Sequence, residues 1–259
     1  MLTIIATLFV IGLLVFVHEG GHFLAAKAVG IRVWEFALGF GPRIFSFKGK
    51  QTRYSIRALP LGGFVALAGM DQPPESEEAL SEDHPENFQS RPLWQRFMVI
   101  AAGPVMNLVL AVFLFALYFN QIGVTTSPVQ EVLPDSPAQR AGIQVGDILV
   151  GTDPNTPLTS EQLVWTISRS ANRTFRLYFL RDGKMESRLV TPQAQSDGRG
   201  LLGITFGGVG KVFRLGGWRS IRQGWHYNNL MIQMVVQALG KMFRGTGIRE
   251  MTGPVGMFK

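Results

Sequence analysis

The chain has 259 residues, of which 46% are hydrophobic and 17% charged, and it carries a net charge of +7. Soluble domains contain roughly 25% charged residues, so this composition indicates a membrane protein with a soluble insert. The absence of cysteine excludes disulfides, a thiolate nucleophile and thiolate zinc ligands, which leaves His, Asp and Glu for any metal. No nucleic-acid motif accompanies the positive charge. We therefore interpret it as a bias towards a lipid surface and expect no nucleic-acid partner.

An apolar run at the start of the chain predicts the first transmembrane helix. Residues 2–17 are apolar apart from two threonines and one glycine, and the run resumes at 23–26 after a short polar insert. A secretory signal would carry positive charge before the run and a small-residue cleavage site after it, and the sequence has neither. Together the two pieces are long enough for about 30 Å of hydrocarbon. We predict a transmembrane helix over residues 1–30.

Residues 31–92 are expected to form a β region followed by an acidic loop. Residues 54–58 and 64–67 are strand-like, and the Leu-Pro-Leu-Gly-Gly sequence at 59–63 between them is typical of a turn, so we predict a β-hairpin. Residues 71–86 are acidic, contain prolines and lack periodicity, which favours a loop.

A second apolar run without charge, at 97–119, predicts another transmembrane helix over 93–120. Asn107 is its only strongly polar residue. Residues 124–207 then have the composition of a soluble domain, with short strand patterns, a helix candidate and an Arg-Asp-Gly-Lys hairpin signal at 181–184. This pattern predicts a small α+β module.

Residues 208–259 contain a helical pattern at 219–243 that is apolar and rich in methionine, but also holds Gln233, Gln237 and Lys241. This mixture is typical of an amphipathic helix lying on a membrane surface, and a third span is the alternative. Many basic residues lie between the two predicted spans, so the positive-inside rule places that segment in the cytoplasm and the N-terminus and the α+β module outside. The tail after the module is also basic, which weakens this orientation.

The sequence His-Glu-Gly-Gly-His at 18–22 carries the chemistry. On a helix, residues four apart share a face, so the imidazoles of His18 and His22 can reach one zinc ion. Glu19 is then placed to take a proton from a metal-bound water without being a ligand itself. The alternative is a chance cluster at a helix end. However, two of the chain's four histidines lie here inside an apolar helix, where unpaired polar groups are costly.

Several segments together resemble the bacterial site-2 proteases, which are the M50 family of intramembrane zinc metalloproteases. The resemblance is carried by His18–His22, Gly39–Pro42, Leu59–Val65, Ala102–Asn107, Ser136–Ala138, Ala141–Ile143, Gly146–Leu149 and Thr252–Gly256, which follow the family order. It implies a membrane protein with an α-helical transmembrane core, a membrane-associated β-hairpin, an α+β PDZ domain at 124–207 and an amphipathic helix, located in the bacterial inner membrane.

The resemblance implies cleavage of single-span transmembrane substrates such as anti-sigma factors or signal-peptide remnants. It implies Zn²⁺ bound by His18 and His22, with Glu19 as the base and an Asp in an L-D-G motif as the third ligand. No such motif occurs in the sequence, so we expect a C-terminally truncated chain whose third ligand lies beyond Lys259. The alternative is a membrane-anchored PDZ protein that binds partners without catalysis.

By the same resemblance, the hairpin dips into the membrane and holds unwound substrate as an added strand, with Gly62, Gly63 and Phe64 as substrate-binding residues. Asn107 is expected to bind substrate backbone or to steady the oxyanion, and helix–helix contact is its alternative role. The PDZ peptide-binding loop is assigned to three consecutive residues, Leu202, Gly203 and Ile204.

Overall fold

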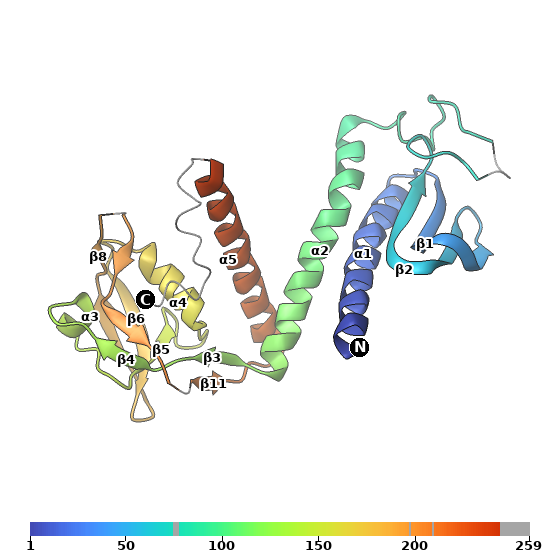
Figure 1. The fold of residues 1–259 in the computed structure, drawn as a ribbon. Coiled ribbons are helices and arrows are strands. Elements are labelled where there is room, and N and C mark those ends of the chain that lie inside the picture. The colour runs from blue at the N-terminus through green and yellow to red at the C-terminus, as the bar shows by residue number, and fades with distance from the viewer. Residues whose placement is uncertain (75–77, 197, 209, 244–259) are drawn as a thin grey trace. The chain divides into compact units, whose positions relative to one another are not determined.

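The structure, a computed structural model, describes residues 1–74, 78–196, 198–208 and 210–243. The chain forms two compact units, residues 1–111 and 112–259, which are described separately (Figure 1). The match expected at 252–256 lies outside the described residues.

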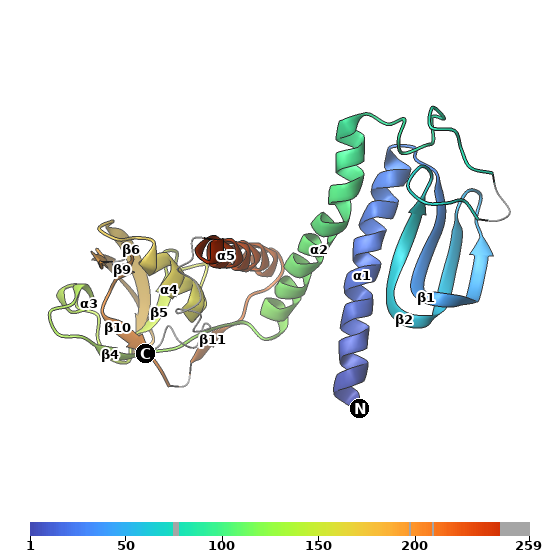
Figure 2. The same ribbon diagram turned by 45° about the horizontal axis from the view of Figure 1, so that its top comes forward.

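The first unit is built from two long helices and a sheet. Both predicted apolar helices are present, and each is long and apolar enough to cross a membrane. The two helices approach each other closely at Gly21 and Ala102, and the sheet packs against the first helix (Figure 2). The elements are α1 (Leu2–Ala28), β1 (Val33–Lys48), β2 (Arg53–Leu67) and the first part of α2 (Leu93–Gln121).

A glycine ends α1. Gly30 has a φ of +73° and its N–H donates to the carbonyl of Lys27, while the N–H of Ile31 reaches back to the carbonyl of Ala26. These two bonds form a Schellman motif, which satisfies the last helical carbonyls. Ala26 and Ile31 are both buried in the core that α1 shares with the sheet. The chain therefore turns from the helix into β1 with the carbonyls of Ala26 and Lys27 paired.

The sheet joins β1 and β2 as a bent antiparallel pair. Residues 35–38 of β1 have partners on two sides, at 53–56 and at 63–66 of β2. Residues 63–67 have β1 as their only strand partner within the described parts of the chain, and on their other edge the N–H of Leu67 donates to the carboxylate of Asp71. Rings from α1 and β1 lock the sheet onto the helix, since Phe36 lies 5.7 Å from Phe16 and 5.3 Å from Phe23 between centroids.

The predicted hairpin is confirmed in its turn and wrong in its pairing. Residues 53–56 run in the same direction as 35–38 and residues 63–66 in the opposite direction, so the chain reverses at 59–63 as well as between β1 and β2 at 49–52. Residues 63–67 pair with 33–38 rather than with 54–58. The glycines there mark a bend, since Gly62 has a φ of +96°. The loop expected at 71–86 is confirmed for its described residues, which contain no helix.

A buried carboxylate ties the sheet together. Glu35 is 4% exposed and accepts hydrogen bonds from Arg43, Arg57 and Ser55. Burial by itself raises the pKa of a carboxyl, but the three donors outweigh it and lower the pKa of Glu35 to about 2. Glu35 is therefore ionised at any physiological pH and pairs with two guanidinium groups.

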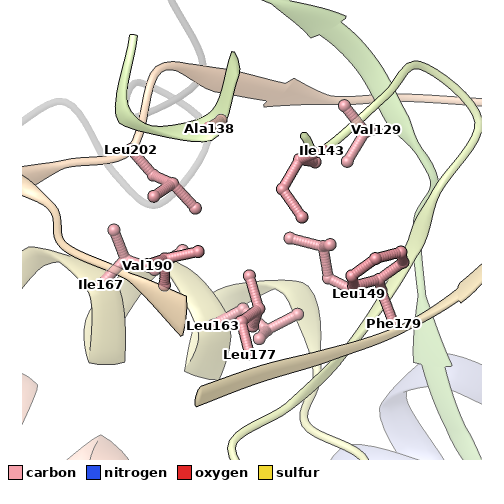
Figure 3. Packing of buried hydrophobic residues seen from close by; sticks show 10 residues of the cluster. All are labelled: Val129, Ala138, Ile143, Leu149, Leu163, Ile167, Leu177, Phe179, Val190 and Leu202. Carbon is pink, nitrogen blue, oxygen red and sulfur yellow. The ribbon is translucent and has the colours of Figure 1, made fainter. Parts of the chain in front are cut away.

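The second unit contains the predicted α+β module. Its core holds apolar side chains from strands, helices and loops (Figure 3). The strand patterns and the helix candidate of the sequence are confirmed, and Asp182 and Gly183 make the predicted hairpin turn with φ values of 49° and 78°. The elements are β3 (Val124–Thr126), β4 (Val129–Val132), α3 (Pro137–Arg140), β5 (Ile148–Gly151), α4 (Ser160–Ser168), β6 (Phe175–Arg181), β7 (Lys184–Val190), β8 (Gln193–Ala194), β9 (Gly200–Leu201), β10 (Ile204–Phe206), β11 (Lys211–Phe213) and α5 (Trp218–Phe243).

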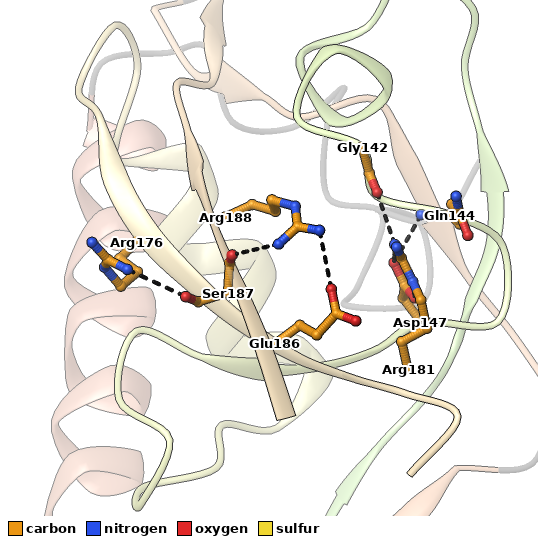
Figure 4. Close-up of polar contacts among 8 residues, drawn as sticks. All are labelled: Gly142, Gln144, Asp147, Arg176, Arg181, Glu186, Ser187 and Arg188. Carbon is orange, nitrogen blue, oxygen red and sulfur yellow. Dashed lines mark hydrogen bonds and ion pairs between the residues drawn. The ribbon is translucent and has the colours of Figure 1, made fainter. Parts of the chain in front are cut away.

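The sheets of this unit are small and antiparallel. β6 lies between β5 and β7, and the remaining strands pair two by two, β4 with β10, β3 with β11 and β8 with β9. A buried ion pair braces the loop before β5: Asp147, 1% exposed, accepts two bonds from Arg181, which also donates to the carbonyl of Gly142 (Figure 4).

The helical pattern at 219–243 is confirmed as α5. One face is buried, with Gln223 of α5 donating to Gln162 of α4 at 2.7 Å. Gly224 lets the helix approach the end of α2, where a Cβ would meet the backbone of Val112 and Ala116. The opposite face exposes large apolar side chains, which agrees with the predicted amphipathic character.

Candidate metal centre

Two imidazoles of α1 meet in the first unit. The Nε2 atoms of His18 and His22 are 3.2 Å apart. Two nitrogen ligands at about 2.0–2.1 Å from a tetrahedral zinc ion lie about 3.3–3.4 Å from each other. The helical spacing of the two residues thus brings their ring nitrogens together at nearly the separation that one zinc ion requires. Both side chains are partly exposed, so a ligand or water can reach them.

A backbone carbonyl of α2 orients His22. The Nδ1 atom of this residue lies 2.7 Å from the carbonyl oxygen of Val99. A carbonyl oxygen only accepts, so Nδ1 carries the proton and a neutral ring keeps its lone pair on Nε2. Pro104, inside α2, has no N–H for the carbonyl of Ile100 and so loosens the helix beside Val99. An imidazole binds zinc through the ring nitrogen that carries no proton, and in His22 this nitrogen is Nε2.

The side chain of Asn107, also on α2, reaches His18. Its Nδ2 lies 3.3 Å from Nδ1 of His18, and its Oδ1 is buried without a hydrogen-bond partner among the described residues. Asn107 was predicted to bind substrate backbone or to steady the oxyanion, which stays a prediction, and the structure brings its amide against a predicted metal ligand. Each of the two histidines is therefore contacted through Nδ1 by a different group of α2.

Two glycines allow α1 and α2 to approach this closely. A Cβ on Gly21 would lie 2.8 Å from the carbonyl carbon of Ala102, so only a glycine lets the two backbones pack here. A Cβ on Gly103 would lie 2.7 Å from Nε2 of His18 and closer still to Nε2 of His22. The space in front of the two nitrogens is thus free because position 103 has no side chain, and this is the space that a metal ion would need.

Glu19 lies next to the pair. It is partly buried, its carboxylate interacts electrostatically with both imidazoles, and it faces the backbone amide of Val65 in β2. The predicted base is thus near the predicted ligands, on the side towards the sheet. Val65 belongs to the stretch of β2 whose outer edge has no strand partner among the described residues.

The two imidazoles, the open space at Gly103 and the unpaired Oδ1 of Asn107 fit a zinc ion, with His18 and His22 as two of its ligands. Within the described residues no group of three His, Cys, Asp or Glu side chains is placed to hold a metal. A catalytic zinc normally has three protein ligands, so these residues supply part of a site.

The predicted substrate-binding residues Gly62, Gly63 and Phe64 lie in β2, directly before Val65. Gly62 has a φ of +96°, and a Cβ there would meet the ring of Phe40, while the backbone of Gly63 packs against the carbonyl of Ala37. The ring of Phe64 stacks on Phe40 at 6.3 Å and has the guanidinium of Arg57 over it. These contacts shape the bend of β2 and leave the role in substrate binding a prediction.

The predicted peptide-binding loop lies in the second unit. Leu202 is 1% exposed and belongs to the core, and its carbonyl accepts from the N–H of Ala138. Gly203 has a φ of +78°, and Ile204 begins β10, paired with Val132 of β4. The loop is therefore built into the module, and its binding of a peptide stays a prediction.

Sequence reasoning missed the carbonyl of Val99 and the space at Gly103. A backbone carbonyl has no sequence signature. The Gly103-Pro104 pair inside an apolar run was a signal for Gly103, because both residues are poor helix formers and need a packing reason there.

Comparison with known proteins places the chain in a family. Residues 6–259 match the model of Peptidase family M50, so the chain belongs to this family of membrane zinc metalloproteases, and zinc is the expected metal. It is 31% identical over 99% of its length to a protein of Clostridium acetobutylicum named as a zinc metalloprotease, and 30% identical over 99% to the zinc metalloprotease RasP of Bacillus licheniformis. It covers 73% and 79% of those two proteins. A zinc metalloprotease by name from Synechocystis is 41% identical over 65% of the chain, which covers 47% of that relative.

Proposed function

We propose that this chain forms part of an endopeptidase that cleaves transmembrane segments of single-span proteins inside the bacterial inner membrane. The observation that carries the proposal is the pair of Nε2 atoms 3.2 Å apart on an apolar helix, with a carboxylate beside them. A polar cluster of this kind inside a span is costly unless it is functional. Substrates such as anti-sigma factors or signal-peptide remnants are the expected class.

In this proposal His18 and His22 hold the metal through Nε2, and Glu19 takes the proton from the attacking water and gives it to the leaving amine. Zinc, when bound, supplies the Lewis acidity that lowers the pKa of that water to about 7 and polarises the scissile carbonyl. Partial exposure of the three side chains admits water to the site. The sheet bounds the site on the side of Val65.

The outer edge of residues 63–67 has no strand partner among the described residues, which supports a way of holding substrate, and substrate paired there would replace the contacts of Val65 with Glu19 and of Leu67 with Asp71. A helical substrate has to unwind before its backbone can be cut, and an unwound segment can pair with a free strand edge. The edge lies beside Glu19, since Val65 is the residue whose amide faces that carboxylate. We propose that substrate is added as a strand here, with Gly62, Gly63 and Phe64 shaping the adjacent bend.

For the second unit we propose a PDZ domain over 124–207 that lies outside the cytoplasm together with the N-terminus. The short antiparallel sheets, the helix α4 and the Gly203 loop are compatible with that fold. Residues 71–86 would then face the cytoplasm. A reporter inserted there is expected to give a cytoplasmic signal, and an external signal would invert the topology.

The experiment that tests the activity is the substitution Glu19→Gln in the full-length protein with a model single-span substrate. Glutamine cannot accept the proton, so cleavage is expected to fall by at least a factor of about 100, the range of general base catalysis, while zinc content is unchanged. Glu82→Gln, an exposed carboxylate of the acidic loop, is the matched control and is expected to cleave normally. Full activity of Glu19→Gln would refute Glu19 as the base. Absence of cleavage by the unaltered protein would favour the non-catalytic PDZ alternative.

A further inference from the structure

The amide of Asn107 contacts His18, but one of its polar atoms lacks a hydrogen-bond partner among the described residues. The Nδ2 of Asn107 faces Nδ1 of His18 at 3.3 Å, and the Oδ1 of the same amide is buried with no hydrogen-bond partner among the described residues. The two ends of an amide are assigned from their hydrogen bonds rather than observed, so the alternative orientation, with Oδ1 towards His18, is equally compatible with the shape of the side chain.

The opposing nitrogens connect each orientation of the amide with a different state of the site, one with a proton between the two rings and one with a metal ion there. His22 keeps its proton on Nδ1, because the carbonyl of Val99 can only accept. Its Nε2 then offers a lone pair towards the Nε2 of His18, 3.2 Å away. If Nδ2 of Asn107 donates to His18, the proton of His18 has to sit on Nε2, between the two rings, where a metal ion would otherwise bind. If Oδ1 accepts from Nδ1 of His18, both Nε2 lone pairs are free for one ion.

We propose that Asn107 is a positioning residue that accepts a hydrogen bond from Nδ1 of His18 and so holds that imidazole in the tautomer able to bind zinc. Val99 does the same for His22 through its carbonyl. One helix thus carries the two ligands and the other sets the tautomer of both. This inference rests on the proposed zinc site, and it replaces direct contact with substrate as the first role of Asn107.

The position of Asn107 supports this role. Gly103 and Asn107 are one helical turn apart on α2, so the open space at Gly103 and the amide at Asn107 face the same pair of rings. Hydrogen-bond partners of metal-binding histidines typically raise metal affinity 10-fold to 100-fold by fixing the ring and its tautomer. When Oδ1 of Asn107 faces His18, the Nδ2 of the same amide points away from the ring and can donate to other groups.

The test measures zinc affinity of the purified protein by competition with a chromophoric chelator, and the visible spectrum of the Co²⁺-substituted protein. Asn107→Leu, which cannot accept, is expected to raise the Kd for zinc 10-fold to 100-fold and to alter the Co²⁺ bands. Asn107→Asp, which only accepts, is expected to keep the Kd within about threefold, well inside that 10-fold to 100-fold range. Asn120→Leu, an exposed asparagine on the same helix, is the matched control and is expected to change neither.

The outcomes separate the possibilities. If Asn107 only joins the helices, Asn107→Leu lowers the thermal stability of the metal-free protein and leaves the Kd for zinc unchanged, which overturns the inference. If Asn107 acts on substrate or oxyanion alone, Asn107→Leu lowers kcat with unchanged zinc affinity and Asn107→Asp is as inactive as Asn107→Leu, which also overturns it. If the unaltered protein binds no zinc, the proposed function fails first, independently of Asn107.

Discussion

Alanine at position 103 would place a methyl group where the two imidazoles of the candidate metal centre lie. The added Cβ would be 2.7 Å from Nε2 of His18, whereas ordinary van der Waals contact begins at 3.4 Å, so the ring has to move by 0.7 Å or the helices have to separate. Zinc–ligand distances are defined within about 0.2 Å, so a displacement of this size exceeds what the site tolerates. We expect Gly103→Ala to weaken zinc binding at least 100-fold, about 2.8 kcal/mol at about 1.4 kcal/mol for each factor of ten.

The assay is the competition titration for zinc, with circular dichroism to show that the helices still form. Gly20→Ala is the matched control, since its Cβ would have nothing within 4 Å, although Gly20 lies between the two ligands in sequence. Gly20→Ala is expected to bind zinc normally and to stabilise α1, because alanine is the better helix former by about 1 kcal/mol. A Gly103→Ala protein that binds zinc within threefold of the unaltered protein would refute the close approach of α2 to the ligands.

Three further predictions concern packing and charge. Gly21→Ala should force the backbone of Ala102 away and increase hydrogen exchange in both helices, whereas protection equal to that of the unaltered protein would contradict the helix contact. The depressed pKa of Glu35, about 2 against an ordinary 4.5, stabilises the fold at pH values above 4.5 and this stability is lost as pH falls towards 2. Glu35→Gln in the metal-free protein should therefore lose about 3 kcal/mol of local stability at neutral pH and flatten the pH dependence of hydrogen exchange in β1; an unchanged slope would argue against the ion pairs. Asp147→Asn should lower the stability of the second unit by roughly 3–5 kcal/mol in chemical unfolding, because it leaves the guanidinium of Arg181 without its carboxylate, and a loss below about 1 kcal/mol would show that the pair is screened.

The two helices and the approach of the His18 and His22 rings were predictable because their signals are local. Apolar length gives α1 and α2, and the spacing of His18 and His22 places both rings on one face of a helix. In the second unit, the Asp182-Gly183 turn was predictable because both residues adopt positive φ readily, which is what a tight hairpin turn requires.

The sheet and the surroundings of the ligands were not predictable from local signals. The glycines at 62 and 63 are typical of a turn, but residues 63–67 find their partner at 33–38, some thirty positions earlier, and only the tertiary fold selects that register. The acceptor for His22 is a backbone carbonyl, which any residue at position 99 would provide. Asn107 was recognised as a functional residue because it is polar in an apolar run, yet which group it contacts depends on how α2 crosses α1.

The division of labour between α1 and α2 links metal binding to helix association. The proposed ligands His18 and His22 lie on α1, while the carbonyl of Val99 and the amide of Asn107 lie on α2. A ligand that binds more tightly when the two helices are associated also stabilises their association, and the two free energies are equal. Zinc would therefore act as a cohesive element between the helices in a bilayer, where apolar side chains give little net drive for association. Removing the metal would weaken the association of the two helices, and separating the helices would lower the affinity for the metal. Metal retention therefore reports on whether the helix pair is intact.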